Sequence, residues 1–244
     1  MPNNYFQFKQ FKVQQDQCAM KVTTDGCLFG AWVAKLVTQH FSDAESIVDI
    51  GAGTGLLSLM LAQETNAAIQ AIEVDPAAAG QAVDNFRNSP WNERLTVIAT
   101  DIKQLPVTGF DIIISNPPFY ENDLRSGAGN KNLAHHDAGL LLHELVAIIR
   151  QQLNTGGSFF LLLPYKREEE VLKLIQQQHL YTTQITRVKQ SDSHSFFRTM
   201  IMGTHAANNL LLTQNEMSIR DSNNNYTDTF MALLQPYYLY YKGS

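Results

Sequence analysis

Short apolar runs alternate with longer segments in which apolar residues recur at helical spacing along most of this chain. The short runs predict buried strands, and the longer segments predict amphipathic helices. Strands are expected at residues 46–50, 68–73, 95–100, 110–115, 159–163, 181–188 and 196–202. Helices are expected at 56–63, from Pro76 onward, and at 140–153, 167–178 and 227–234.

This order of elements predicts an α/β fold with a doubly wound, mostly parallel sheet of seven strands. Only the turn Lys189 to Ser195 separates the last two strands, so they should form a hairpin with one strand antiparallel. Residues 208–225 are mostly polar and are expected to form an appended loop or a small ribbon. We expect one domain over 1–244, with an N-terminal segment at 1–40, a core at 41–205 and a C-terminal extension at 206–244.

Composition limits the classes of protein that fit. With 244 residues, 44% of them apolar, the chain can bury one sizeable core. Cys18 and Cys27 suggest neither a disulfide framework nor a zinc site, which fits a reducing, cytoplasmic compartment. No apolar run is long enough to span a bilayer, and the N-terminus lacks a signal-peptide core. A net charge of −5 argues against non-specific coating of nucleic acid but allows a local basic patch.

A glycine-rich loop, Gly51-Ala52-Gly53-Thr54-Gly55, joins the first core strand to its helix and follows Asp49. Glycine is needed where the backbone turns sharply and a ligand approaches it closely. The spacing G-x-G-x-G differs from that of a dinucleotide-binding loop, and the Lys and Ser or Thr of a phosphate-binding loop are missing. The ligand therefore need not carry a phosphate, and Asp49 suits a cationic or amine-bearing ligand.

Acidic residues close the second and third strands, where a parallel sheet places its ligand contacts. Glu73 follows the second strand directly and suits ribose hydroxyls, whereas Asp75 precedes Pro76 and is typical of a helix N-cap. Asp101 ends the third strand and can accept from an adenine amino group, with Ile102 packing beside the ring. These residues predict a nucleoside site at the edge of the sheet.

The tetrapeptide Asn116-Pro117-Pro118-Phe119 follows the fourth strand. Its two prolines fix the backbone, so that carbonyl groups point outward in a rigid array. Asn116 adds a side-chain acceptor, and Phe119 adds a flat face for stacking. Acceptors that pull on the hydrogens of a planar amine favour its nucleophilic, pyramidal form in the transition state. Alone, the tetrapeptide fits either methyl transfer to a planar nitrogen or an ordinary proline-rich turn.

In order along the chain, Val48 to Leu59, Glu73, Asp101 and Asn116 to Phe119 are similar to the motifs of class I S-adenosylmethionine-dependent methyltransferases. The Asn-Pro-Pro-Phe form resembles the members that act on exocyclic or amide nitrogens. This resemblance implies a Rossmann-like methyltransferase fold and S-adenosylmethionine as the cofactor.

A narrower likeness extends over nearly the whole chain. Four segments resemble the bacterial tRNA1(Val) adenine-37 N6-methyltransferase family: Lys21 to Gly26, Gly30-Ala31-Trp32, Asn116 to Tyr120, and Tyr226 to Phe230. The likeness implies methyl transfer to N6 of an adenine in tRNA, adenine-37 of tRNA1(Val), with no metal. It does not determine the oligomeric state, for which a monomer is our expectation.

The resemblance also implies roles for individual residues. The methionine part of the cofactor would lie among Asp49, Gly51, Ala52, Gly53 and Gly55; Glu73 would hold its ribose, and Asp101 and Ile102 its adenine. Thr24, Asp25 and Gly26 would form a lid-like segment over the same pocket. Asn116, which also belongs to the cofactor site, and the Pro117 carbonyl would accept from the target amine. Pro118 completes the catalytic loop, and Phe119 would stack on a base that is unstacked or flipped from the RNA.

RNA contacts are the least determined feature. Candidate phosphate contacts are Lys9, Lys12, Lys21, Arg125, Lys131, Lys166 and Arg167. Phe6, Phe8 and Phe11 interleave with the first lysines, either as a base-stacking surface or as a small strand packed on the domain. His135 and His136 follow the catalytic loop without partners for a metal site, so a surface or supporting role is expected.

Two other functions stay open. A protein glutamine N5-methyltransferase poses the same electronic problem at an amide nitrogen, and the acidic net charge is compatible with it. Those enzymes generally carry a helical N-terminal domain, for which the roughly forty residues before the first strand are too few. A cofactor-binding scaffold without catalysis is disfavoured by the intact Asn116.

Overall fold

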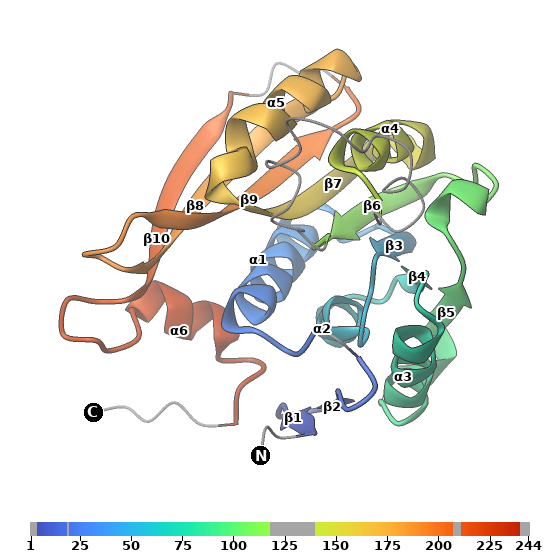
Figure 1. Ribbon diagram of the computed structural model, residues 1–244, viewed down its shortest axis with the longest axis horizontal. Helices are drawn as coiled ribbons and strands as arrows, with labels where there is room; N and C mark the ends of the chain where they lie inside the picture. The colour runs from blue at the N-terminus through green and yellow to red at the C-terminus, as the bar shows by residue number, and fades with distance from the viewer. Residues whose placement is uncertain (1–3, 19, 118–139, 207–210, 240–244) are drawn as a thin grey trace, which may run out of the picture.

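The protein is built around a central sheet with helices on both faces (Figure 1). Its structure is a computed structural model, which describes residues 4–18, 20–117, 140–206 and 211–239. The sheet has eight strands in the order β10-β8-β9-β7-β6-β3-β4-β5. These strands are β3 (Ser46–Ile50), β4 (Ala68–Glu73), β5 (Leu95–Ala99), β6 (Phe110–Ser115), β7 (Leu153–Pro164), β8 (Tyr181–Ser191), β9 (Phe196–Thr204) and β10 (Thr213–Arg220). The strands β1 (Tyr5–Gln7) and β2 (Lys12–Gln14) form a separate antiparallel pair.

The predicted fold class is confirmed. Neighbouring strands from β7 to β5 run parallel, and β9 runs antiparallel to both β7 and β8. The expected count of seven strands is wrong, because Thr213–Arg220 adds an eighth, parallel to β8. The segment expected to be a loop or ribbon is therefore the outer edge of the sheet.

Six helices lie in the part of the chain that the structure describes: α1 (Thr24–His40), α2 (Leu56–Glu64), α3 (Pro76–Arg87), α4 (Leu142–Gln152), α5 (Glu168–Gln177) and α6 (Asp228–Leu234). Helices α1, α2 and α6, with Phe86 of α3, belong to the hydrophobic core on one face of the sheet. Helices α4 and α5 belong to a second core on the other face. Helices on both faces make the sheet doubly wound, as the sequence predicts (Figure 1).

Helix α1 is not among the predicted elements. It begins at the N-cap Thr23, whose side chain accepts from the Gly26 N–H. Most of its residues are buried, so it lacks the polar face that marks an amphipathic helix in sequence. Residues 24–40 therefore form an inner part of the domain. Of the described helices, none combines the length and apolar character needed to cross a membrane.

Strand β3 lies at the point where the strand order reverses. It pairs with β4 on one side and with β6 on the other. The chain passes outward from β3 through β4 to β5, and then returns to β6 and passes outward on the opposite side. In open α/β sheets, ligands bind in the crevice outside the carboxyl ends of the strands at such a reversal. The fold thus places the loops after β3 and β6 side by side at the expected ligand position.

Candidate functional site

The glycine loop forms a left-handed turn at the carboxyl end of β3. Gly51, Gly53 and Gly55 have φ angles of 73°, 55° and 79°, which glycine adopts without steric cost. The backbone N–H groups of Gly51 and Ala52 donate to the Ile72 carbonyl at 2.9 and 3.1 Å, tying the loop to β4. A Cβ on Gly51 would meet no atom within 4 Å, so space is open beside this residue. The loop is a backbone cradle with room for a ligand.

Asp49 lies beneath this loop and is fully buried. Its Oδ2 accepts from Ser58 of helix α2, through the backbone N–H at 3.2 Å and the hydroxyl at 2.8 Å. Its Oδ1 is buried without a hydrogen-bond partner among the described residues. Burial raises the pKa of Asp49 to about 7, against the lowering effect of the Ser58 bonds. The orphaned oxygen is an acceptor that a ligand with an amine donor would satisfy.

Glu73, at the end of β4, is held by two backbone amides. Its Oε2 accepts from Gly53 at 2.8 Å, and its Oε1 accepts from Asp75 at 2.9 Å. These bonds fix the carboxylate beside the glycine loop and leave each oxygen a further lone pair for a hydroxyl donor. Asp75 caps helix α3 by accepting from the Ala77 N–H at 3.1 Å, as the sequence predicts.

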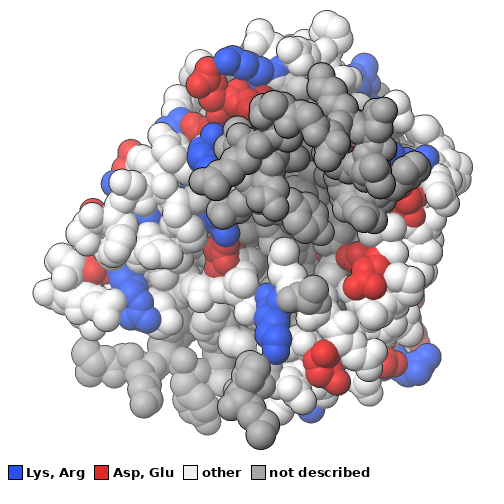
Figure 2. Space-filling model, in the orientation of Figure 1, with Lys and Arg blue, Asp and Glu red and all other residues white. Residues whose placement is uncertain are grey.

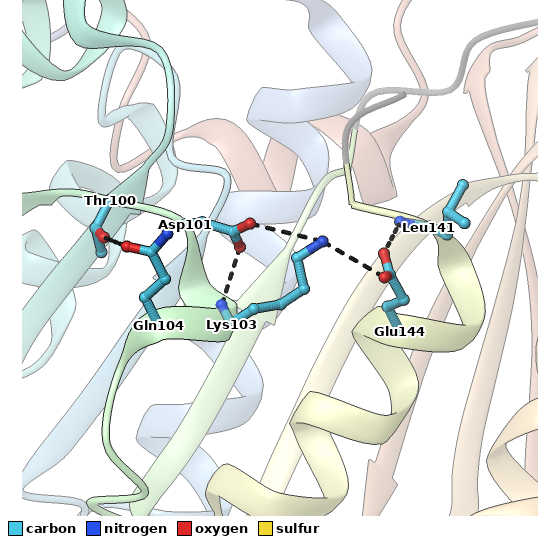
Figure 3. Close-up of polar contacts among 6 residues, drawn as sticks. All are labelled: Thr100, Asp101, Lys103, Gln104, Leu141 and Glu144. Atoms are coloured by element: carbon cyan, nitrogen blue, oxygen red, sulfur yellow. Dashed lines mark hydrogen bonds and ion pairs between the residues drawn. The ribbon is translucent and has the colours of Figure 1, made fainter. Parts of the chain in front are cut away.

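Asp101 follows β5 and caps the short helix η2 (Ile102–Gln104), accepting from the Lys103 N–H at 2.9 Å. Ile102, the next residue in the chain, is buried. Figure 3 shows the Lys103 side chain extending from η2 between the carboxylates of Asp101 and Glu144, the latter on helix α4. A carboxylate and an apolar side chain are thus adjacent at this strand end, which suits an adenine ring.

Asn116 and Pro117 leave the carboxyl end of β6. The Ser115 hydroxyl donates to the Ile50 carbonyl at 2.7 Å, which joins the end of β6 to the end of β3. Asn116 is partly exposed, whereas Pro117 is buried. The fold therefore brings this loop and the glycine loop to the same reversal of the sheet. Pro118 and Phe119 lie outside the described residues, and their expected roles stay predictions.

Thr24, Asp25 and Gly26 form the first turn of α1. A Cβ on Gly26 would lie 3.6 Å from Leu56, the residue that follows the glycine loop, so this turn packs beside the cradle. Asp25 pairs with Arg198 of β9 at 2.7 Å. The turn belongs to a long, buried helix, and its role as a cover over a cofactor stays a prediction.

Two amide side chains of helix α3 contribute to the site without a signal in the sequence. Asn85 accepts from the Gln14 N–H at 2.8 Å and donates to the carbonyls of Gln14 and Thr54 at 3.0 and 2.9 Å. Gln81 accepts from the Gln17 N–H at 2.7 Å. Together they fasten the segment after β2 to α3 and to the glycine loop. A buried amide on a helix is indistinguishable in sequence from one on its solvent face.

Some of the candidate RNA-contact residues pack in the core, and others make contacts with neighbouring residues. Phe8 and Phe11 are buried, so they pack in the core and do not form a base-stacking surface. Lys9 donates to the Gln235 carbonyl at 2.5 Å, and Lys12 lies 4.9 Å from the centre of the Tyr5 ring.

The remaining candidates are scattered. Arg167 pairs with Glu170, while Lys21 and Lys166 are exposed. Arg125, Lys131, His135 and His136 lie outside the described residues. In Figure 2 the visible Lys and Arg side chains lie apart, with Asp and Glu among them. On the face that Figure 2 draws, the described Lys and Arg side chains form no continuous stripe.

The reversal of the sheet, the glycine cradle and the acidic residues at three strand ends define an S-adenosylmethionine-dependent methyltransferase. The model of the methyltransferase small domain family matches residues 32–190, more than half of the chain. The chain belongs to this family, and within it to the tRNA1(Val) (adenine(37)-N6)-methyltransferases.

Two relatives that bear that name support the narrower membership. The protein of Cytophaga hutchinsonii is 38% identical over 242 residues, covering 98% of this chain and 99% of its own. The protein of Flavobacterium psychrophilum is 38% identical over 238 residues, covering 96% of this chain and 99% of its own.

A solved structure supports the fold. A protein of Agrobacterium tumefaciens, described as a predicted O-methyltransferase, matches with a TM-score of 0.69 and 16% identity. The match covers 90% of this chain and all of that one. At this identity the likeness concerns the fold alone.

In the part of the chain that the structure describes, no group of three or more His, Cys, Asp or Glu side chains could hold a metal ion.

Proposed function

We propose that this protein transfers a methyl group from S-adenosylmethionine to the exocyclic N6 of an adenine in tRNA, and that the target is adenine-37 of tRNA1(Val). The observation that carries the proposal is the position of Asn116 and Pro117 beside the glycine cradle, at the reversal of the sheet. The full-length similarity to relatives named for this reaction supports the choice of substrate.

The described residues fit the cofactor. The orphaned Asp49 Oδ1 lacks a donor, and the open side of Gly51 leaves room for a ligand against the backbone. Glu73 would accept from the ribose hydroxyls, and Asp101 would accept from the adenine amino group, with Ile102 against the ring. When bound, S-adenosylmethionine supplies an activated methyl group.

Asn116 and Pro117 would act on the acceptor amine. The lone pair of adenine N6 is delocalised into the ring, so the amine is a poor nucleophile until its two hydrogens are drawn out of the plane. The Asn116 side-chain oxygen and the Pro117 carbonyl would accept hydrogen bonds from this amine and stabilise its pyramidal form in the transition state. Phe119 would hold the base by stacking, which contributes about 1–3 kcal/mol per base.

Incubation with labelled S-adenosylmethionine and either total tRNA or total protein tests the proposal. Label in the tRNA that digestion recovers as N6-methyladenosine is the expected result. Label confined to protein would overturn the proposal in favour of a glutamine N5-methyltransferase. Since tRNA is the proposed substrate, we place the reaction in the cytoplasm. The expected monomer is a prediction that sedimentation of the purified protein would test.

A further inference from the structure

An ammonium group bridges two carboxylates that come from different parts of the fold. Lys103 Nζ lies 3.4 Å from Glu144 Oε1 and 3.6 Å from Asp101 Oδ2. Asp101 and Lys103 lie at the carboxyl end of β5, whereas Glu144 lies in the first turn of α4, after β6. Figure 3 shows the Lys103 side chain spanning the gap between these two elements.

Glu144 is the fixed end of this bridge. Its Oε2 accepts from the Leu141 N–H at 3.0 Å, which satisfies an unpaired amide before helix α4. This backbone hydrogen bond, with a smaller contribution from Lys103, lowers the pKa of Glu144. The helix is itself anchored, because Leu145, Val146 and Ile149 pack in the second core. Glu144 therefore presents a charged oxygen at a defined position.

Asp101 is the end that the bridge positions. Its Oδ1 is used by the Lys103 N–H, so Oδ2 is the oxygen left for a ligand. At 3.6 Å, Lys103 attracts Oδ2 by charge but does not reach normal hydrogen-bond distance. At 3.4 Å, the ammonium is closer to Glu144, to which it donates. The arrangement orients the Asp101 carboxylate while leaving a lone pair of Oδ2 for an N–H donor.

The ammonium of Lys103 compensates the negative charges of the two carboxylates. Without the ammonium, the carboxylates of Asp101 and Glu144 would stand near each other uncompensated, and like charges repel. Partial burial works against the ammonium, yet the two carboxylates outweigh it and raise the pKa of Lys103. The raised pKa favours the charged form of Lys103 in the bridge.

We propose that Lys103 is a positioning residue, which holds the Asp101 carboxylate for the adenine amino group of the cofactor by anchoring it to Glu144. This inference rests on the proposed function, because it requires Asp101 to bind the cofactor's adenine. Lys103 itself need not touch the cofactor. The bridge gives helix α4 an influence on cofactor affinity, although α4 follows β6 in the chain whereas Asp101 follows β5.

Calorimetry of S-adenosylmethionine binding to Lys103→Met, Glu144→Gln and the double variant tests the bridge. Glutamine at 144 keeps an oxygen for the Leu141 N–H and removes only the charge. Each single variant should weaken binding about three- to fivefold, the range of a partly exposed ion pair. The double variant should be no weaker than either single one, since both remove the same interaction. Lys103→Arg should restore most of the affinity.

A matched control is the exposed pair Lys173 and Glu169, 2.6 Å apart on helix α5. Lys173→Met and Glu169→Gln should leave cofactor affinity unchanged. In steady state, Lys103→Met should raise KM for S-adenosylmethionine with kcat unchanged, a split that general loss of structure would not give. Unchanged affinity in Lys103→Met, or losses that add in the double variant, would overturn the proposal.

Asp101→Asn separates the two levels of inference. Asparagine can still cap η2 but lacks the charged acceptor, so binding should weaken about tenfold. If Asp101→Asn weakens binding and the bridge variants do not, the bridge is wrong and the cofactor assignment stands. If Asp101→Asn binds normally, the adenine assignment fails and the bridge with it. Methylation of tRNA by the unchanged protein tests the proposed function independently of both.

Discussion

The Glu73 carboxylate accepts a hydrogen bond from the Gly53 N–H at 2.8 Å, joining the end of β4 to the centre of the glycine loop. Its other oxygen accepts from Asp75, so both oxygens face backbone donors. In Glu73→Gln, the new amide group must point its hydrogens at one of these donors. A partly buried N–H then loses its acceptor, which costs about 0.5–1.5 kcal/mol of unfolding free energy.

The same substitution should weaken S-adenosylmethionine binding about tenfold, because the loop and the proposed ribose acceptor are disturbed together. Chemical denaturation and calorimetry measure the two effects. Glu64→Gln, at an exposed position of α2, is the control and should change neither quantity. Normal cofactor affinity in Glu73→Gln would remove Glu73 from the cofactor site.

Asp49 makes stability depend on pH. Its pKa rises from 3.8 to about 7 because it is buried, so the folded protein keeps a proton that the unfolded chain releases. The free energy of unfolding therefore falls as the pH rises from 3.8 to about 7, and it levels off at higher pH. At 1.36 kcal/mol per pKa unit, this shift lowers the free energy of unfolding by about 4 kcal/mol between the two ends of that pH range.

Asp49→Asn should remove this dependence. Denaturant midpoints of the cofactor-free protein, measured at about pH 5 and about pH 8, should converge for the variant relative to the unchanged protein. Equal pH dependence in both proteins would show that Asp49 ionises normally in the fold.

Gly55 is required by space as well as by backbone angle. Its φ is 79°, and a Cβ would lie 2.4 Å from Phe86 Cε1, which is itself buried. Gly55→Ala should lower the unfolding free energy by about 2–4 kcal/mol, combining left-handed strain with overpacking. The matched control is Gly80 in α3, where a Cβ would meet no atom within 4 Å. Gly80→Ala should stabilise by about 0.5–1 kcal/mol, and equal effects at both positions would contradict this account.

Asn85 should matter far more than its neighbour Asn88. Asn85→Ala removes three hydrogen bonds and leaves the buried Thr54 carbonyl and the partly buried N–H and carbonyl of Gln14 without this partner, costing about 2–3 kcal/mol of unfolding free energy. Asn88 is exposed and donates only to the Asp84 carbonyl, so Asn88→Ala should stay within about 0.5 kcal/mol. Thermal denaturation compares them, and similar losses would show that Asn85 does not anchor the N-terminal segment.

The sequence predicts the central strands and misses the edge. Strands β3, β4 and β6 are buried apolar runs, and their predicted bounds match the structure. Strand β10 begins with four exposed residues and has only Ile219 buried, so its polar sequence resembles a loop. An edge strand is held by backbone hydrogen bonds to one neighbour, which leave no apolar pattern. Helix α1 is missed for the opposite reason, since burial on most sides removes the helical period.

The candidate site likewise contains residues that the sequence points to and residues that it does not. Asp49, Glu73 and Asp101 are predictable because each directly follows or belongs to a recognisable strand, and parallel strands bring their carboxyl ends together. Asn85 and Glu144 act from helices that come next to the site only after folding. Phe8 and Phe11 could not be assigned from sequence, because an aromatic residue between lysines fits both a core and a binding surface.

The proposed role of Asn116 is to activate an adenine amine in tRNA. Mass spectrometry of nucleosides from tRNA1(Val), after incubation with S-adenosylmethionine, tests it most directly in the unchanged protein and Asn116→Ala. We predict N6-methyladenosine at position 37 with the unchanged protein. We expect a rate at least about 100-fold lower with the variant, which should still bind the cofactor. Absence of N6-methyladenosine with the unchanged protein, or an equal rate in the variant, would contradict the account.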